Sequence, residues 1–202
     1  MDEQGLIHDA QQGDLDAFNR LVLAYQDQAF NLAFRMMGEE DSAADATQNA
    51  FISAYKNIRA YRGGSFRAWV LRMVTNTCYD ELRRRHRHPS VPLEPTGEDD
   101  EEVESPQWLA DDSPSPEESA EKAELEQAIQ NCLNHLPEEF RSVVVLIDVQ
   151  GLDYAEVSAI TGKPLGTVKS RLARGRLRLR KCLQGVWELL PSAFRLEDEA
   201  MQ

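Results

Sequence analysis

Residues 163–181 contain eight Lys and Arg residues and no acidic residue, a pattern suited to binding phosphates and base edges. At 100° per residue, Val168, Leu172 and Gly175 fall on one face of a helix and polar residues on the other. The candidate DNA contacts on and beside the polar face are Thr167, Lys169, Ser170, Arg171, Ala173, Arg174 and Arg178. Arg and Lys in a major groove read guanine and neutralise phosphates, so the pattern predicts a DNA-binding helix. A solvated surface helix is the alternative, although such helices normally interleave charges of both signs.

A shorter helix before this stretch completes a helix-turn-helix pattern. Asp153 and Glu156 have the spacing of a capping box, which predicts a helix beginning at Asp153. Gly162 tolerates the backbone conformation that ends a helix, and Pro164 prevents simple continuation. The second helix is therefore predicted over about 166–181, and two short helices joined by such a turn are typical of DNA-binding proteins.

The N-terminal half carries a second candidate site, in which aromatic rings are interleaved with Arg and Asn. The candidates on a predicted helix over 66–85 are Trp69, Arg72, Asn76, Tyr79 and Arg83. The loop just before that helix adds Tyr61, Arg62, Gly63, Gly64 and Ser65. Rings stack on unpaired bases and Arg binds phosphates, so the set predicts binding to a single strand. Trp69 and Tyr79 as ordinary core residues are the alternative.

The remaining elements are also predicted to be helical. Apolar residues recur every three or four positions over 14–36 and about 41–58, and a loop is predicted over about 59–65. Further helices are predicted over about 119–136 and from Pro137 to before Gly151, with Pro137 in the first turn. The fold class is therefore predicted to be all-α, with two small helical domains.

A long acidic segment separates the two predicted domains. Residues 89–118 contain eleven acidic residues, six of the nine prolines and no Lys or Arg. Such a segment is expected to stay an extended, flexible linker. The expected division is a first domain over 1–88, a second over 119–190 and a tail over 191–202.

Overall composition excludes several classes of protein. The 202 residues carry a net charge of -13, but the acidic linker accounts for most of it. No apolar run approaches the roughly 20 residues that cross a bilayer, and the acidic N-terminus does not resemble a signal peptide. The three cysteines (Cys78, Cys132 and Cys182) are odd in number and widely spaced, so neither a disulfide framework nor a zinc site is expected. A reducing cytoplasm is the expected location.

Other function classes have weaker support from the residues. The four histidines are scattered, and no nucleophile, phosphate loop or metal-ligand spacing is present, so neither catalysis nor a cofactor is expected. Membrane-surface binding is disfavoured because the apolar face of the basic helix has Gly175 and no aromatic residue. A stand-alone helix-turn-helix regulator, with the N-terminal half as a sensor, remains open.

Six stretches, in this order, resemble the extracytoplasmic-function (ECF) group of bacterial RNA polymerase sigma factors. They are DATQNAF (45–51), YRGGSFRAW (61–69), VTNT (74–77), LPEEFR (136–141), GLDYAE (151–156) and GTVKSRLARGR (166–176). Each is modest alone, but together they span nearly the whole chain outside the linker. The resemblance implies a monomeric initiation factor that an anti-sigma factor holds inactive until a stress releases it.

The resemblance also implies roles for particular residues. The first domain would bind the promoter's −10 element, with the loop 61–65 holding a flipped base and Asn76 beside it. The second domain would bind the −35 element through the basic helix. Core RNA polymerase would be contacted at its β′ coiled coil and β flap, and the implied residues for the coiled coil are Asp45, Gln48, Asn49 and Phe51.

Overall fold

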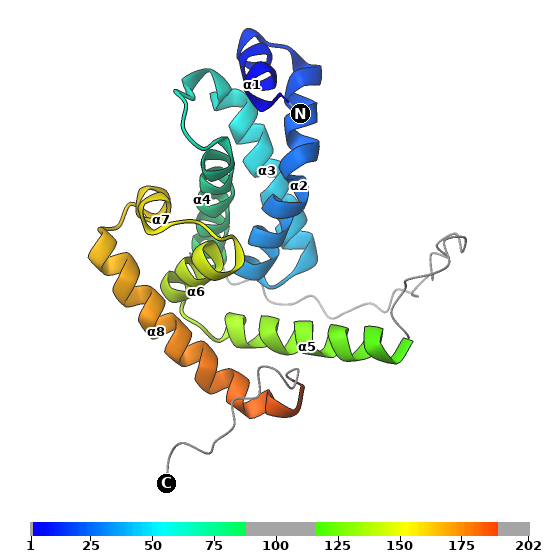
Figure 1. Ribbon diagram of the computed structural model, residues 1–202, viewed down its shortest axis with the longest axis vertical. Coiled ribbons are helices and arrows are strands. Elements are labelled where there is room, and N and C mark those ends of the chain that lie inside the picture. The colour runs from blue at the N-terminus through cyan, green and yellow to red at the C-terminus, as the bar shows by residue number, and fades with distance from the viewer. Residues whose placement is uncertain (1, 88–115, 190–202) are drawn as a thin grey trace.

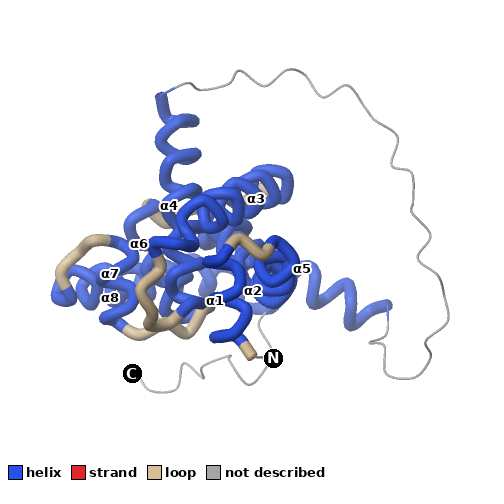
Figure 2. Tube along the Cα trace, turned by 90° about the horizontal axis from the view of Figure 1, so that it is seen from above, coloured by secondary structure: helices blue, strands red, loops and turns tan. Residues whose placement is uncertain are grey.

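The computed structural model describes residues 2–87 and 116–189. Every regular element within these two ranges is a helix, which confirms the all-α class (Figures 1 and 2). Residues 89–115 of the predicted linker, and the predicted tail over 191–202, lie outside the described residues. Residues 116–118, which were assigned to the linker, begin a helix instead.

Four α-helices form the first half of the molecule. They are α1 (Glu3–Gln12), α2 (Leu15–Met37), α3 (Glu40–Asn57) and α4 (Phe66–Arg87), with a short 3-10 turn, η1 (Ile58–Ala60), after α3. The side chain of Asp14 caps α2 by accepting the backbone N–H groups of Asp16 and Ala17 at 2.8 and 3.1 Å. Helix α2 ends at Gly38, whose φ of 81° favours glycine.

The second half contains α5 (Pro116–Asn134), α6 (Glu138–Val144), α7 (Tyr154–Thr161) and α8 (Leu165–Leu183). A π-helical turn, η2 (Val145–Val149), continues α6, and a 3-10 segment, η3 (Gln184–Leu189), follows α8. Pro137 lies one position before α6, at its N-cap, instead of in the first turn. The predicted single helix after Pro137 is thus an α-helix that widens into a π turn.

The two halves are packed against each other. Figure 1 shows α6 and α7 beside α4, with α5 crossing the lower end of the first half. One hydrophobic cluster includes α2–α4 residues such as Leu32 and Val74 together with second-half residues such as Leu136 and Phe140. A smaller cluster, which includes Ile7 and Phe66, belongs to the first half alone.

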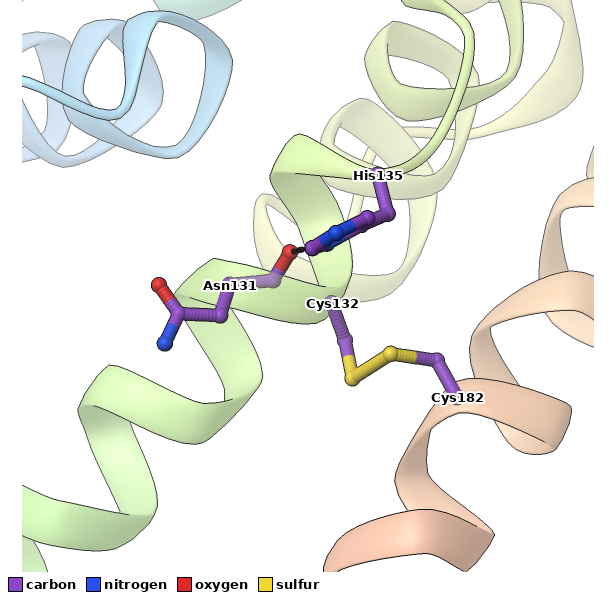
Figure 3. The surroundings of a disulfide bond; sticks show 4 residues. All are labelled: Asn131, Cys132, His135 and Cys182. Carbon is purple, nitrogen blue, oxygen red and sulfur yellow. Dashed lines mark hydrogen bonds between the residues drawn. A yellow bond between two sulfur atoms is a disulfide. The ribbon is translucent and has the colours of Figure 1, made fainter.

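The structure contains a disulfide bond that the cysteine count argued against. Cys132 of α5 and Cys182 of α8 are joined, with Cα atoms 5.7 Å apart (Figure 3). The expectation of no disulfide was wrong. The two cysteines are 50 positions apart in the sequence, and only the side-by-side packing of α5 and α8 brings them together. Cys78 is a buried free thiol, and desolvation raises its pKa to about 12.

Two kinds of feature, a membrane-spanning helix and a metal-binding cluster, are absent from the described part of the chain. No helix there is both long and apolar enough to span a membrane. No group of three or more His, Cys, Asp or Glu side chains within 2–87 and 116–189 is placed to hold a metal ion.

Candidate nucleic-acid interface

The helix-turn-helix forms as its local signals predict. Asp153 Oδ1 accepts the backbone N–H of Glu156 at 2.8 Å, and Glu156 Oε2 accepts that of Asp153 at 3.0 Å. The capping box thus fixes the start of α7. Gly162, with a φ of 64°, ends α7, and the Ser158 hydroxyl donates to the Lys163 carbonyl across the turn at 2.6 Å. Pro164 then stands at the N-cap of α8.

Close packing sets the orientation of α8. Val168 and Leu172 are buried against the core, and a Cβ at Gly175 would lie 2.6 Å from Val144 Cγ2. Glycine therefore allows α8 to approach α6 closely. Because this apolar face is fixed, the opposite face of α8 points away from the core.

The outer face of α8 presents the predicted base-reading side chains. Lys169, Ser170, Ala173 and Arg174 are exposed, and Thr167 is half-buried beside them. Lys169 Nζ lies 5.5 Å from the ring centroid of Tyr154, which belongs to α7. Five of the seven predicted −35 residues therefore lie together on one accessible strip.

Arg171 and Arg178, the other two predicted contacts, interact with α6 in this structure. Arg171 Nη2 lies 2.5 Å from Glu139 Oε2, and the Arg178 guanidinium lies 4.9 Å from the ring centroid of Phe140. A third cation, Arg176, forms a two-point ion pair with Asp148, which raises the pKa of its guanidinium. These contacts hold the flanks of α8 against its own domain.

The loop before α4 has the open backbone predicted for it. Gly63 and Gly64 have φ values of 103° and 95°, and a Cβ at either position would meet no atom within 4 Å. Two successive positive φ angles explain the glycine pair. Ser65 Oγ caps α4 by accepting the backbone N–H of Ala68 at 3.1 Å, and Arg62 is exposed.

Tyr61 differs from the expectation of a ring available to bases. Its ring is buried, 5.4 Å from that of Phe66 and 5.5 Å from that of Trp69. Its hydroxyl donates to the Gly64 carbonyl at 2.7 Å, so Tyr61 shapes the loop from beneath. Burial of this aromatic cluster is the physical reason, and half-buried Trp69 is the ring that stays partly accessible.

Gln11 is a supporting residue that sequence reasoning missed. From α1, its Nε2 donates to the carbonyls of Ile58 and Tyr61 at 3.1 and 3.0 Å. These bonds hold the entry to the glycine loop. The sequence signal for α1 is the helical spacing of Leu6, Ile7 and Ala10, whose side chains are buried. This spacing indicates a packed helix but does not single out Gln11.

The α4 face that was predicted to hold a single strand is only partly free. Arg72, Asn76 and Arg83 are exposed, whereas Tyr79 is half-buried and its hydroxyl donates to Ser142 of α6 at 2.6 Å. Desolvation raises the pKa of Tyr79. A groove of about 470 Å³ separates this face from the second half and is lined by Asn76, Tyr79, Asp80 and Arg83 of α4 and by residues of α6–α8.

The implied polymerase-binding residues on α3 are divided between surface and core. Asp45, Gln48 and Asn49 are exposed. Phe51 is partly buried and packs against both hydrophobic clusters, so it contributes to the packing of α3. The large apolar side chains that α3 exposes are Ile52 and Tyr55, with 46% and 40% of their surface accessible.

Comparisons with known proteins agree with this two-part architecture. A family model described as Sigma-70 region 2 matches residues 21–88, and one described as Sigma-70, region 4 matches residues 126–179. Two solved structures share the fold: the Bartonella quintana sigma factor RpoE in complex with the anti-sigma factor NepR, and CnrH in complex with the cytosolic domain of CnrY. Each is 24% identical with a TM-score of 0.63; they cover 84% and 91% of this chain and 98% and 97% of their own.

Curated relatives are more similar in sequence. The RNA polymerase sigma-H factor of Pseudomonas aeruginosa is 36% identical over 90% of this chain and 94% of its own length. The ECF sigma factor SigW of Bacillus subtilis is 35% identical over 88% and 95%. The ECF sigma factor SigE of Mycolicibacterium smegmatis is 37% identical over 85% of this chain, which spans 63% of that relative.

The helical halves and their matches therefore define a protein of the sigma-70 class. Within that class, the chain belongs to the ECF group of RNA polymerase sigma factors.

Proposed function

We propose that this chain binds bacterial core RNA polymerase, recognises the −35 and −10 elements of promoters and helps to melt the DNA. The observation that carries the proposal is the exposed, basic outer face of α8. Helix α8 is the second helix of a helix-turn-helix whose first helix, α7, begins with a capping box. Lys169, Ser170 and Arg174 reach base edges in the −35 major groove, and Thr167 and Ala173 contact the bases beside them. Arg171 and Arg178 bind phosphates once they leave α6.

The −10 element is assigned to the first half. The glycine loop over 61–65 receives a flipped base, Trp69 and Asn76 border it, and Arg62, Arg72 and Arg83 bind the strand's phosphates. The domain limits that accompany this assignment are 1–88, 119–190 and the linker between them. Their support is the separate matching of residues 21–88 and 126–179.

The free-energy cost of separating the DNA strands is too large for this chain alone, so melting requires a partner. Losing four stacked steps costs roughly 6 kcal/mol at about 1.4 kcal/mol per step. A captured base returns roughly 1–3 kcal/mol by stacking. The chain alone therefore cannot hold a bubble open, and contacts within the polymerase complex must supply the difference.

The polymerase partner is assigned to two surfaces. The outer face of α3, with Asp45, Gln48 and Asn49, docks on the β′ coiled coil, joined by the exposed side chains of Ile52 and Tyr55. The second domain docks on the β flap. The chain acts in the cytoplasm by binding and without catalysis, is monomeric outside these complexes and is restrained by an anti-sigma factor.

The test is transcription with purified core polymerase on genomic DNA, followed by sequencing of the transcript starts. The expected result is initiation that depends on the chain, at sites sharing two motifs about 25 base pairs apart. Tight binding of the chain alone to a palindromic duplex, without polymerase-dependent initiation, would instead identify a stand-alone regulator.

A further inference from the structure

Helix α1 packs against η1 and the start of the glycine loop. Leu6 and Ile7 of α1 share one buried cluster with Tyr61 and Phe66, the residues at either end of that loop. The match to Sigma-70 region 2 begins at residue 21 and therefore does not include α1. A role for α1 in base capture thus rests on its contacts in this structure.

Gln11 of α1 binds the chain on both sides of η1. Its Nε2 donates to the Ile58 carbonyl at 3.1 Å and to the Tyr61 carbonyl at 3.0 Å. Ile58 is the first residue of η1, and Tyr61 is its C-cap and the first residue of the glycine loop. Because an amide NH₂ group has two hydrogens, one side chain satisfies both carbonyls. The two bonds fix the direction in which the chain enters the loop.

Other hydrogen bonds of this segment are local. The Tyr61 hydroxyl donates to the Gly64 carbonyl at 2.7 Å, and Arg62 Nη1 donates to the Arg59 carbonyl at 2.8 Å; each bond spans three positions. The bonds from Gln11 span 47 and 50 positions. The local bonds therefore shape the loop, whereas Gln11 ties it to the rest of the domain.

The helix that carries Gln11 is itself held in place. Asp2 Oδ1 accepts the backbone N–H of Gly5 at 3.1 Å and caps the start of α1. The Tyr25 hydroxyl of α2 donates to the Glu3 carboxylate. Burial together with this bond raises the pKa of Tyr25 to about 12. Helix α1 is thus fixed to α2, and Gln11 keeps a constant position relative to the loop.

The glycine pair makes such anchoring necessary. Gly63 and Gly64 have no side chain, and the space in which a Cβ would lie is open at both positions. Glycine also has the greatest conformational freedom of any residue. A loop of this kind keeps one conformation only if its ends are held, and a binding loop that is ordered in advance loses less entropy when its ligand arrives.

We propose that Gln11 is a positioning residue for base capture, which holds the carbonyls beside η1 so that the glycine loop has its base-binding conformation before DNA arrives. The proposal rests on the function proposed above. Without these bonds the loop occupies several conformations, and its apparent affinity for the flipped base falls with the population of the competent one. Two neutral hydrogen bonds correspond to a fall of about tenfold.

The test variant is Gln11→Met, which keeps the approximate size and helix preference of the side chain but removes both N–H donors. Gln12→Met is the matched control, because Gln12 is the next residue of α1 and is exposed. Circular dichroism should show equal helical content in both variants, since Leu6, Ile7 and Ala10 still bury α1.

The measurement is open-complex formation by core polymerase with the full chain, on a promoter found by transcript sequencing. Abasic sites are placed one at a time along the non-template strand of its −10 element. For the wild type, loss of the captured base should reduce open-complex formation by about tenfold or more, because the stacking of one base is lost. Gln11→Met should shrink this penalty by about fivefold or more at that position alone.

The position-specific comparison distinguishes positioning from general destabilisation. An unchanged penalty in Gln11→Met would overturn the proposal. An equal fall at every abasic position, or the same change in Gln12→Met, would also overturn it, because the effect would then not act through the captured base.

Gln11→Glu is a second variant of nearly the same size that lacks the donors. At pH 8 its carboxylate cannot donate to the two carbonyls, so it should reproduce the loss seen with Gln11→Met. A wild-type penalty in Gln11→Glu would show that the donors are not required and would overturn the proposal even if Gln11→Met failed to fold.

The wild-type result separates this proposal from the function on which it rests. If the wild type directs no initiation, the proposed function fails and the positioning role fails with it. If the wild type initiates without a position-specific penalty, base capture and its positioning fail while promoter-directed initiation stands. If the penalty exists and neither Gln11 variant changes it, only the positioning role fails.

Discussion

Among single side chains, Arg174 is the most direct test of base reading by α8. It is exposed on the outer face, where a guanidinium can form two hydrogen bonds to guanine. Arg174→Ala should weaken −35 recognition by about 1–3 kcal/mol and relax the base preference at one position. The measurement is transcription by the reconstituted polymerase from a promoter library with a randomised −35 element.

Arg180→Ala is the matched control on the same helix. Arg180 is also exposed but lies nearer the C-terminus of α8, beyond the predicted base contacts. Its loss should weaken binding evenly across the library and reduce the salt dependence by about one phosphate contact. Identical sequence profiles for the two variants would show that Arg174 does not read bases.

Gly175 is the residue at which the packing of α8 can be tested. A Cβ there would lie 2.6 Å from Val144 Cγ2 and 3.4 Å from the Phe140 carbonyl oxygen, and Val144 is buried and stiff. Gly175→Ala should lower the free energy of unfolding by about 1–2 kcal/mol, since overpacking outweighs the better helix propensity of alanine. Urea unfolding followed by circular dichroism measures the change.

Gly166→Ala provides the comparison within α8. A Cβ at this position would meet no atom within 4 Å, so the substitution should be neutral or stabilise by up to about 1 kcal/mol. A Gly175 variant as stable as the Gly166 variant would show that α6 and α8 adjust freely to each other.

At the scale of elements, local signals predicted most helices and their ends. Asp153 marked the start of α7 and Gly162 marked its end, because capping depends on neighbours in sequence. The burial of Tyr61 depends on residues far away in the sequence, such as Leu6 and Ile7 of α1, and the π turn η2 was not predicted. Periodicity therefore located the helices, but it did not predict which residues between them would be buried.

The disulfide between α5 and α8 is the clearest example of a feature that local sequence patterns did not predict. It should also stabilise the folded chain. Closing a loop of 50 residues restricts the unfolded chain by an amount worth up to about 4 kcal/mol. Adding dithiothreitol should therefore lower the thermal midpoint of the wild type by several degrees.

The double variant Cys132→Ser/Cys182→Ser separates the bond from other effects of the reductant. Its midpoint should match that of the reduced wild type and should not respond to dithiothreitol. Cys78 is retained in both proteins, and its burial and raised pKa keep it out of thiol exchange. An identical midpoint for oxidised and reduced wild type would contradict a stabilising role.

For the whole molecule, the sequence predicted the two helical domains, but the packing between them could not be predicted. The side chains that join them, such as Gln130, Ser142 and Gln150, are polar, and polar side chains are mostly exposed in proteins. Only the folded arrangement shows that each is buried against the other half.

The last prediction concerns affinity for duplex DNA with and without polymerase. In the structure, α8 offers one exposed basic face while α4 is partly covered, so the free chain should bind a promoter duplex only weakly and with strong salt dependence. Bound to core polymerase, the two tethered domains act together, and affinity should rise by at least about a hundredfold. Fluorescence anisotropy at 150 mM salt with a promoter found by transcript sequencing measures both states. A chain that alone bound this duplex at nanomolar affinity and opened it would show that promoter binding and melting do not depend on polymerase.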